Sequence, residues 1–552
     1  MAQARPRAAY LVEDGDAWRE VSQAEAARAV DELANGLLAL GVRNGDAFGL
    51  FGSTRLEWVL FDFALALIGA VGAPVYMASS ARDAVYVLEH SDAVGVLVEG
   101  EAEREKVAGA DLRHVLSFDD VDGLRARGRE FAAANPDALG EAEAAIGEDD
   151  VFTFIFTSGT TGPPKACMIR HRNYYDMASV VDRVGAVVEP DDVMLLYLPL
   201  AHNFGRLMHL LAARVGFTLA LLPDPLRVAE ALPQVRPTLM PSVPRVFEKL
   251  HTAVTSAFDE ASGLKRRLVR WALAVGGQVS RRLEAGKRVP PALALQRWLA
   301  DRLVFAKVRA KLGGRFRLGI SGGAPLEAEI ARFFHALGIL IVEGYGLTEC
   351  TTAATVNLPD RFRFGTVGPA LPGVQLRIAD DGEILIRTST IFAGYYKEEA
   401  ATREVLDEDG WLHSGDIGNL DEDGFLTVTD RKKDLLVTAG GKNVPPQNLE
   451  NALKRSKYVS QALVVGDRRP YVAALVTLDG PADGLSDEEK RARVQEAVDE
   501  ANRDRSRFEQ IKRFAILPRD FSAEEGEVTP TLKLKRRVCE EHFADEIERL
   551  YS

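Results

Sequence analysis

The chain of 552 residues is too long for a single hydrophobic core, which predicts two or more domains, one of them large. Hydrophobic residues at 47% and charged residues at 27% give the balance of a folded globular protein and exclude a disordered chain. The formal charge of -13 argues against nucleic acid as a partner, because neutralising phosphates requires a basic face.

Helix and strand patterns alternate along most of the chain. Residues 23–40 have the apolar spacing of an amphipathic helix, whereas 47–51 and 93–98 are short apolar runs typical of buried strands. Further strands are predicted at 152–156, 193–198, 218–222 and 339–343. This alternation predicts an α/β fold with largely parallel sheets covered by helices.

The pattern changes after about Gly373. Short strands are predicted at 374–378, 382–387 and 424–429, and the Asp-Gly turns near them favour hairpins. Beyond Asp430 the chain continues as a smaller, charge-rich α+β segment. The predicted division is therefore a large domain at 1–432 and a small domain at 433–552.

Cysteine usage and hydropathy bear on where the chain resides. Cys167, Cys350 and Cys539 form no CxxC pair and no zinc-binding pattern with histidine, which predicts a reducing, cytoplasmic location. No apolar run of signal-peptide length follows the N-terminus, so secretion is not expected. The most apolar stretch, residues 58–77, contains Asp62 and is interpreted as a buried helix followed by a strand.

The strand at 152–156 leads into a loop rich in glycine, hydroxyl groups and lysine. Glycines let backbone N–H groups approach an anion, hydroxyls donate hydrogen bonds or reach a metal ion, and the lysine adds positive charge. The spacing differs from a Walker A motif, which disfavours a P-loop kinase or GTPase, and a Ser/Thr-rich surface turn is the other interpretation. The loop reads Thr157-Ser158-Gly159-Thr160-Thr161-Gly162-Pro163-Pro164-Lys165.

Five later segments carry further clusters of small, aromatic and charged residues. With the phosphate loop, they resemble in content and order the motifs of the acyl-activating, adenylate-forming superfamily, which includes acyl-CoA synthetases, firefly luciferase and nonribosomal adenylation domains. The resemblance implies a small β-barrel-like subdomain at the hairpins and a mobile C-terminal domain. The segments are Gly319-Ile320-Ser321-Gly322-Gly323-Ala324-Pro325-Leu326, Gly344-Tyr345-Gly346-Leu347-Thr348-Glu349, Gly410-Trp411-Leu412-His413-Ser414-Gly415-Asp416, Asp430-Arg431-Lys432-Lys433-Asp434 and Thr529-Pro530-Thr531-Leu532-Lys533-Leu534-Lys535-Arg536-Arg537.

One of these segments also fits the nucleophile elbow of α/β hydrolases, with Ser321 as its serine. A hydrolase requires an acid and then a histidine further along the chain. His335, His413 and His542 are available, but they lie in no recognisable triad context. The hydrolase interpretation is therefore the weaker one.

The resemblance implies which residues hold ATP and magnesium. Tyr345 is expected to stack on adenine, Thr348 to hydrogen-bond the α-phosphate or the acyl adenylate, and Glu349 to hold Mg²⁺ with Thr157. Asp416 is expected to accept both ribose hydroxyls. The other residues expected to bind the nucleotide are Ser158, Gly159, Thr160, Thr161, Gly162, Lys165, Gly322, Gly323, Ala324, Gly344, Gly346 and Arg431.

The resemblance also implies how the reaction proceeds. Lys533, with Lys535 as second candidate, is expected to stabilise charge while a carboxylate attacks the α-phosphate. Rotation of the small domain about Lys433 is then expected to bring the loop Gly440-Gly441-Lys442 to a tunnel for coenzyme A, although a plain glycine turn is the other interpretation. His202 is expected either near the acyl carboxylate or as a packing histidine.

Residues 235–250 and the helical insertion that follows resemble the long-chain fatty acyl class. The expected reaction converts a long-chain fatty acid and ATP to acyl-AMP and pyrophosphate, and then transfers the acyl group to coenzyme A. The alternatives are a fatty acyl-AMP ligase that loads a carrier protein, a synthetase for a medium-chain or aromatic acid, and a noncatalytic acyl-binding relative.

The insertion at 264–312 is strongly basic in an otherwise acidic chain and contains Trp271 and Trp298. A solvated helix face is the favoured interpretation. Peripheral contact with anionic lipid at the inner membrane surface is the alternative that this composition suggests.

Overall fold

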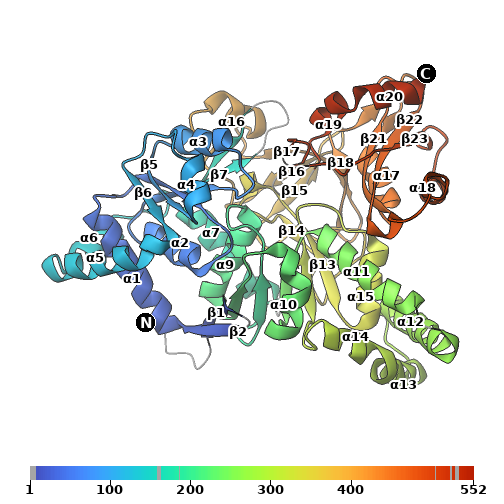
Figure 1. Ribbon diagram of the computed structural model, residues 1–552, viewed down its shortest axis with the longest axis horizontal. Coiled ribbons are helices and arrows are strands. Elements are labelled where there is room, and N and C mark those ends of the chain that lie inside the picture. The colour runs from blue at the N-terminus through green and yellow to red at the C-terminus, as the bar shows by residue number, and fades with distance from the viewer. Residues whose placement is uncertain are drawn as a thin grey trace. The chain divides into compact units, whose positions relative to one another are not determined.

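The computed structural model describes residues 8–15, 17–157, 163–185, 187–260, 262–503, 505–522, 525–528 and 534–552 (Figure 1). Its chain divides into two compact units. Of the described residues, those up to Thr157, Pro164–Leu376 and Ile386–Leu412 belong to the first, and Pro163, Arg377–Leu385 and those in His413–Ser552 belong to the second. The predicted α/β class with mixed, largely parallel sheets and a separate small C-terminal domain is confirmed.

The first unit contains a six-stranded sheet whose strands are parallel except at the β7–β8 edge. Its central strands are almost wholly buried apolar runs, as expected where helices cover both faces of a parallel sheet. The order is β6 (His114–Ser117), β5 (Ala93–Val98), β3 (Ala47–Phe51), β4 (Val71–Val75), β7 (Val151–Thr157) and β8 (Lys165–Arg170).

The first unit also contains an eight-stranded sheet. It is parallel in its middle and has an antiparallel pair at each edge. The order is β14 (Thr355–Val356), β13 (Leu340–Tyr345), β12 (Leu318–Ser321), β11 (Leu239–Ser242), β9 (Val193–Leu196), β10 (Thr218–Leu221), β1 (Ala8–Asp14) and β2 (Ala17–Ser22).

Helices follow most of these strands, as the alternating sequence pattern predicts. The interpretation of residues 58–77 is confirmed, because α2 is buried along most of its length and β4 follows it. Among the described residues, no helix combines the length and the apolar character needed to cross a bilayer. The main helices are α1 (Gln23–Ala39), α2 (Leu56–Leu67), α3 (Ala81–His90), α5 (Val121–Ala134), α7 (His171–Ser179), α9 (Asn203–Val215), α10 (Val228–Val235), α11 (Pro244–Asp259), α12 (Gly263–Glu284), α13 (Pro291–Ala300), α14 (Ala306–Lys311) and α15 (Ala328–Leu337).

A four-stranded sheet lies where hairpins are predicted. Its order is β15 (Gln375–Ile378), β16 (Glu383–Arg387), β17 (Leu412–Leu420) and β18 (Leu426–Arg431). The strand predicted at 424–429 begins two residues later, because Gly424 has a φ of 81° and belongs to the preceding turn.

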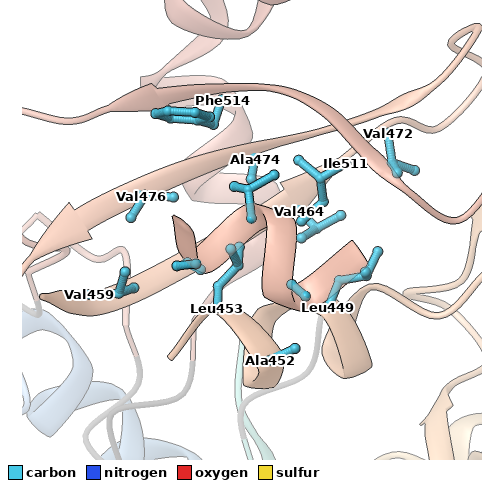
Figure 2. Close-up of a cluster of buried hydrophobic side chains, with 14 of the residues drawn as sticks. Leu449, Ala452, Leu453, Val459, Val464, Val472, Ala474, Val476, Ile511 and Phe514 are labelled. Atoms are coloured by element: carbon cyan, nitrogen blue, oxygen red, sulfur yellow. The ribbon is translucent and has the colours of Figure 1, made fainter. Parts of the chain in front are cut away.

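The second unit has its own core, which supports an independently packed small domain. Figure 2 shows side chains from α17, β21, β22 and β23 gathered in this core, among them Leu453, Val464 and Phe514. The remaining elements are the β19–β20 pair (Leu436–Val437 and Asn443–Val444), α17 (Pro446–Leu453), β21 (Val459–Val465), β22 (Val472–Leu478), α18 (Asp487–Asn502), β23 (Ile511–Ile516), α19 (Arg536–His542) and α20 (Ala544–Tyr551).

Candidate active site

The predicted phosphate loop begins where β7 ends. Thr157 lies opposite Lys165 in the β7–β8 pair, and its hydroxyl donates to the Lys165 carbonyl oxygen at 3.4 Å. The two ends of the loop are thus held together at the edge of the six-stranded sheet. The predicted nucleotide-binding residues Ser158, Gly159, Thr160, Thr161 and Gly162 lie outside the described residues.

Glu349 reaches the site from the eight-stranded sheet. It lies in the short helical turn Thr348–Cys350, just beyond β13, with Thr348 as its neighbour. Its carboxylate Oε1 accepts a hydrogen bond of 2.7 Å from the hydroxyl of Tyr395. The main-chain oxygen of Glu349 accepts a second one, at 2.9 Å, from the backbone N–H of Phe392.

Tyr395 links Glu349 to the phosphate-loop lysine. The Lys165 ammonium lies 5.1 Å from the centroid of the Tyr395 ring, within the range of a cation–π interaction. Burial, followed by the negative charge of Glu349, raises the pKa of Tyr395 far above its usual range, so its hydroxyl stays a donor. One tyrosine therefore joins the anionic and cationic groups that the sequence assigns to the site.

The segment that carries Tyr395 forms an antiparallel bridge to β8, with Tyr395 opposite Cys167. Gly394 accepts from the Met168 N–H at 3.0 Å, and the Tyr396 N–H donates to Ala166 at 2.9 Å. This pairing fixes the direction of the Tyr395 ring. Sequence reasoning missed Tyr395, although a Gly-Tyr-Tyr run after a predicted strand is a signal that was available.

The groups gathered here fit a magnesium ion. Thr157 and Glu349 offer hydroxyl and carboxylate oxygens, the ligands that a hard cation prefers. In the described part of the chain, no three His, Cys, Asp or Glu residues group as a metal site. Two such oxygens would leave the remaining coordination positions to phosphate and water, which is how Mg²⁺ is usually bound.

The backbones of the two glycine-containing loops after β12 and β13 are held in different ways. Gly322 donates its N–H to the Ser242 carbonyl at 3.1 Å, and Gly323 has a φ of 81°, so the backbone turns sharply before Ala324. In the second loop, Gly344 pairs with Val356 and Tyr345 with Thr355 across β14.

Gly346, in the same loop, leaves no space for a side chain. A Cβ atom there would lie 2.0 Å from the carbonyl oxygen of Thr352. The backbone of the turn that carries Glu349 therefore passes this point only because residue 346 is glycine.

Ser321 lacks the surroundings of a catalytic serine. It is 1% exposed in β12, and its hydroxyl has no hydrogen-bond partner within the described chain. A nucleophilic serine requires a base within hydrogen-bonding distance. This arrangement counts against the hydrolase interpretation.

His202 caps a helix. Its Nδ1 accepts a hydrogen bond of 3.1 Å from the backbone N–H of Phe204 at the start of α9. Accepting at Nδ1 places the proton of the neutral ring on Nε2. The cap explains the position of His202, while its expected place near the acyl carboxylate stays a prediction.

In the second unit, the predicted ribose ligands lie together. Asp416 in β17 is opposite Arg431 in β18, and the Arg431 Nε lies 3.2 Å from the Asp416 Oδ1. Asp416 is 4% exposed, so its carboxylate is held in place by the sheet and by this cation. The pair presents two adjoining hydrogen-bonding groups from neighbouring strands.

The predicted hinge motif contains residues with separate structural roles. Asp430 is buried and accepts from the Gln447 N–H at 3.2 Å, and burial raises its pKa to about 6. Lys432 pairs with Asp381 at 2.6 Å, whereas Lys433 is exposed before β19. A rotation axis at Lys433 stays a prediction.

The predicted coenzyme A loop is the turn between β19 and β20. Gly441 has a φ of 70°, and the N–H of Lys442 donates to the Thr438 hydroxyl at 3.2 Å. The turn alone accounts for Gly441, and the tunnel role of Gly440, Gly441 and Lys442 stays a prediction. The predicted catalytic residue Lys533 lies outside the described residues.

Comparisons with known proteins agree with these motifs. The family described as AMP-binding enzyme matches residues 1–396, and the one described as AMP-binding enzyme C-terminal domain matches 433–552. The long-chain-fatty-acid–CoA ligase FadD15 of Mycobacterium tuberculosis is 39% identical, covering 97% of this chain and 93% of its own length.

Proteins of lower sequence identity also match almost the whole chain. The long-chain-fatty-acid–CoA ligase ACSBG2 of Xenopus laevis is 30% identical over 98% of this chain and 81% of its own. Among solved structures, the adenylation domain of a carboxylate reductase from Mycobacterium chelonae has a TM-score of 0.79 at 22% identity, covering 99% of this chain and 89% of that one. At this identity, the solved structure bears on the fold alone.

Proposed function

Since the chain belongs to the AMP-binding enzyme family, we propose that it is a fatty acid–CoA ligase that uses ATP and prefers long-chain acids. The observation that carries the proposal is the meeting of Lys165 and Glu349 at Tyr395. The names of its relatives FadD15 and ACSBG2 support the choice of a long-chain acid.

In the proposed first step, a carboxylate oxygen of the acid attacks the α-phosphorus of ATP. A new P–O bond forms while the bond to the β-phosphate oxygen breaks, which gives acyl-AMP and pyrophosphate. Lys165 faces the growing negative charge, and Asp416 with Arg431 holds the ribose. Glu349 and Thr157 would hold Mg²⁺, which would supply positive charge to the phosphates when bound.

In the proposed second step, the thiol of coenzyme A attacks the acyl carbonyl. A C–S bond forms, the C–O bond to AMP breaks, and the thiol proton leaves to solvent. We place the domain boundary at 432/433 and the hinge at Lys433, and the C-terminal family match that begins at residue 433 supports this division. Lys533 acts in the first step and withdraws before the second.

The test uses purified full-length protein with ATP, magnesium and acids from acetate to oleate, with and without coenzyme A. We expect pyrophosphate, AMP and acyl-CoA, with the largest yield for long chains. Glu349→Gln should lose adenylate formation, whereas Glu399→Gln, a change on an exposed helix, should not. AMP without thioester would identify a carrier-loading ligase, and the absence of acyl-AMP with every acid would refute the proposal.

A further inference from the structure

A basic segment stands out from the acidic chain. Residues 264–312 contain thirteen Lys and Arg against two acidic residues, whereas the whole chain has a net charge of -13. This segment forms α12, α13, a helical turn at Asp301–Phe305 and α14, and Figure 1 shows α12 and α13 side by side. Positive charge is thus concentrated on one group of helices.

The two acidic residues of the segment are engaged within the fold. Glu284 pairs with Arg332 at 3.3 Å, and Asp301 pairs with Arg309 at 2.6 Å and with Arg297 at 3.3 Å. These two carboxylates therefore neutralise arginines packed within the fold and not the exposed cations of the segment. The basic side chains that remain exposed around them include Lys265, Arg267, Arg270, Arg281, Lys287 and Arg302.

The same helices expose an apolar stripe. Leu295, Trp298 and Leu299 are 60%, 55% and 37% exposed and lie three and four residues apart, on one face of α13. Leu303, 43% exposed, follows in the next turn, while Ala300 on the opposite face is buried. A helix face that only meets water ordinarily carries polar residues, so the stripe requires another explanation.

A cation lies beside the stripe. The Arg302 guanidinium lies 5.9 Å from the Trp298 ring. Apolar side chains rimmed by Arg and Lys on a helix are the composition of a surface that lies in the headgroup region of a bilayer, where Trp and Leu enter the acyl boundary. Cations alone fit any polyanion, but the added leucines and tryptophan favour lipid.

We propose that α12, α13 and the turn at Asp301–Phe305 form a docking surface for an anionic lipid bilayer. Leu295, Trp298, Leu299 and Leu303 enter the boundary between headgroups and acyl chains. Arg267 and Arg270, on the side of α12 opposite its buried residues, lie over the lipid phosphates. The proposal goes beyond the ligase activity and does not depend on it, because binding is measured without substrate.

The test is sedimentation with phosphatidylcholine vesicles, with and without phosphatidylglycerol. We expect binding that requires phosphatidylglycerol and falls as salt rises. Each cation near a charged surface contributes about 1 kcal/mol, or roughly fivefold in affinity, so Arg267→Gln/Arg270→Gln should weaken binding by about 25-fold. Leu295→Ser/Trp298→Ser should also weaken it, whereas Leu226→Ser, at a leucine 84% exposed elsewhere, should not.

Equal binding to neutral and anionic vesicles, or wild-type binding by both double variants, would overturn the proposal. So would a protein that ignores vesicles but self-associates through Leu295 and Trp298, because the stripe would then be an interface between copies. Acyl-AMP formation from a water-soluble acid should be unchanged in these variants. A failure of docking is therefore distinguishable from a failure of the ligase assignment.

Discussion

Replacing Tyr395 with phenylalanine tests the central contact of the candidate site. Tyr395→Phe removes the hydroxyl that donates to Glu349 at 2.7 Å but keeps the ring that lies against Lys165. Glu349 then loses the donor that fixes the direction of its carboxylate. We expect adenylate formation to slow while the fold and the position of Lys165 are kept.

The size of the effect follows from the hydrogen bond. A hydrogen bond to a charged group contributes about 1.5–3 kcal/mol, which corresponds to a loss of about 10- to 150-fold if the whole contribution acts in the transition state. The Mg²⁺ concentration for half-maximal rate should rise as well, because a carboxylate free to rotate holds the ion less well. A purely structural tyrosine would lower thermal stability without this change in Mg²⁺ dependence.

The neighbouring residue supplies a matched control. The Tyr396 hydroxyl also donates to a carboxylate, that of Asp92, at 2.8 Å, but this contact is exposed. Tyr396→Phe therefore removes the same group from the same segment without touching Glu349. Pyrophosphate release measured across a magnesium series compares the two, and equal rates and equal magnesium dependence would refute a positioning role for Tyr395.

Three further changes test the surrounding fold. Burial raises the pKa of Glu343 to about 8, so the stability that its neutral carboxyl contributes is fully present below about pH 4.5 and is lost as pH rises through 8. Glu343→Gln should therefore raise the melting temperature near pH 8 and not near pH 5. Arg206→Met should lower the free energy of unfolding, measured by urea denaturation, by about 3–5 kcal/mol, because the buried carboxylate of Asp62, 1% exposed, loses its cation. The double variant Arg206→Met/Asp62→Leu should recover most of this loss. Gly346→Ala should abolish adenylate formation, since its Cβ would meet a main-chain oxygen at 2.0 Å, whereas Gly123→Ala, in open space, should retain it.

The regular elements could be predicted wherever local pattern decides them. The strands predicted at 47–51 and 93–98 coincide with β3 and β5, because buried parallel strands are continuous apolar runs. The strand predicted at 339–343 instead continues to Tyr345, since Gly344 and Tyr345 pair with β14. That pairing depends on a fold-back of the chain, which local periodicity does not record.

The candidate site likewise has residues that the sequence motifs identify and contacts that only the structure shows. Motif order led to Thr157, Lys165, Glu349, Asp416 and Arg431, and the structure places Asp416 beside Arg431 and Thr157 beside Lys165. The resemblance assigns Lys165 and Glu349 to one nucleotide site, but no local pattern in the sequence shows how the two residues are held together. Their connection runs through Tyr395, a residue distant from both in the chain, and only the pairing of its segment with β8 reveals it.

The turn that carries Glu349 is held by contacts from distant segments, which a short sequence motif does not contain. Directly after the turn, Thr351 and Thr352 have φ values of 55° and 89°, a region that threonine rarely adopts. The Thr351 hydroxyl donates to the Thr390 carbonyl at 2.6 Å, and the Thr352 hydroxyl donates to Asn203 at 3.4 Å. Strained residues persist only when their surroundings hold them. The direction of Glu349 is therefore set jointly by the start of α9, by the segment at Thr390 and by Tyr395, so that changes at any of these distant points should act on the same carboxylate.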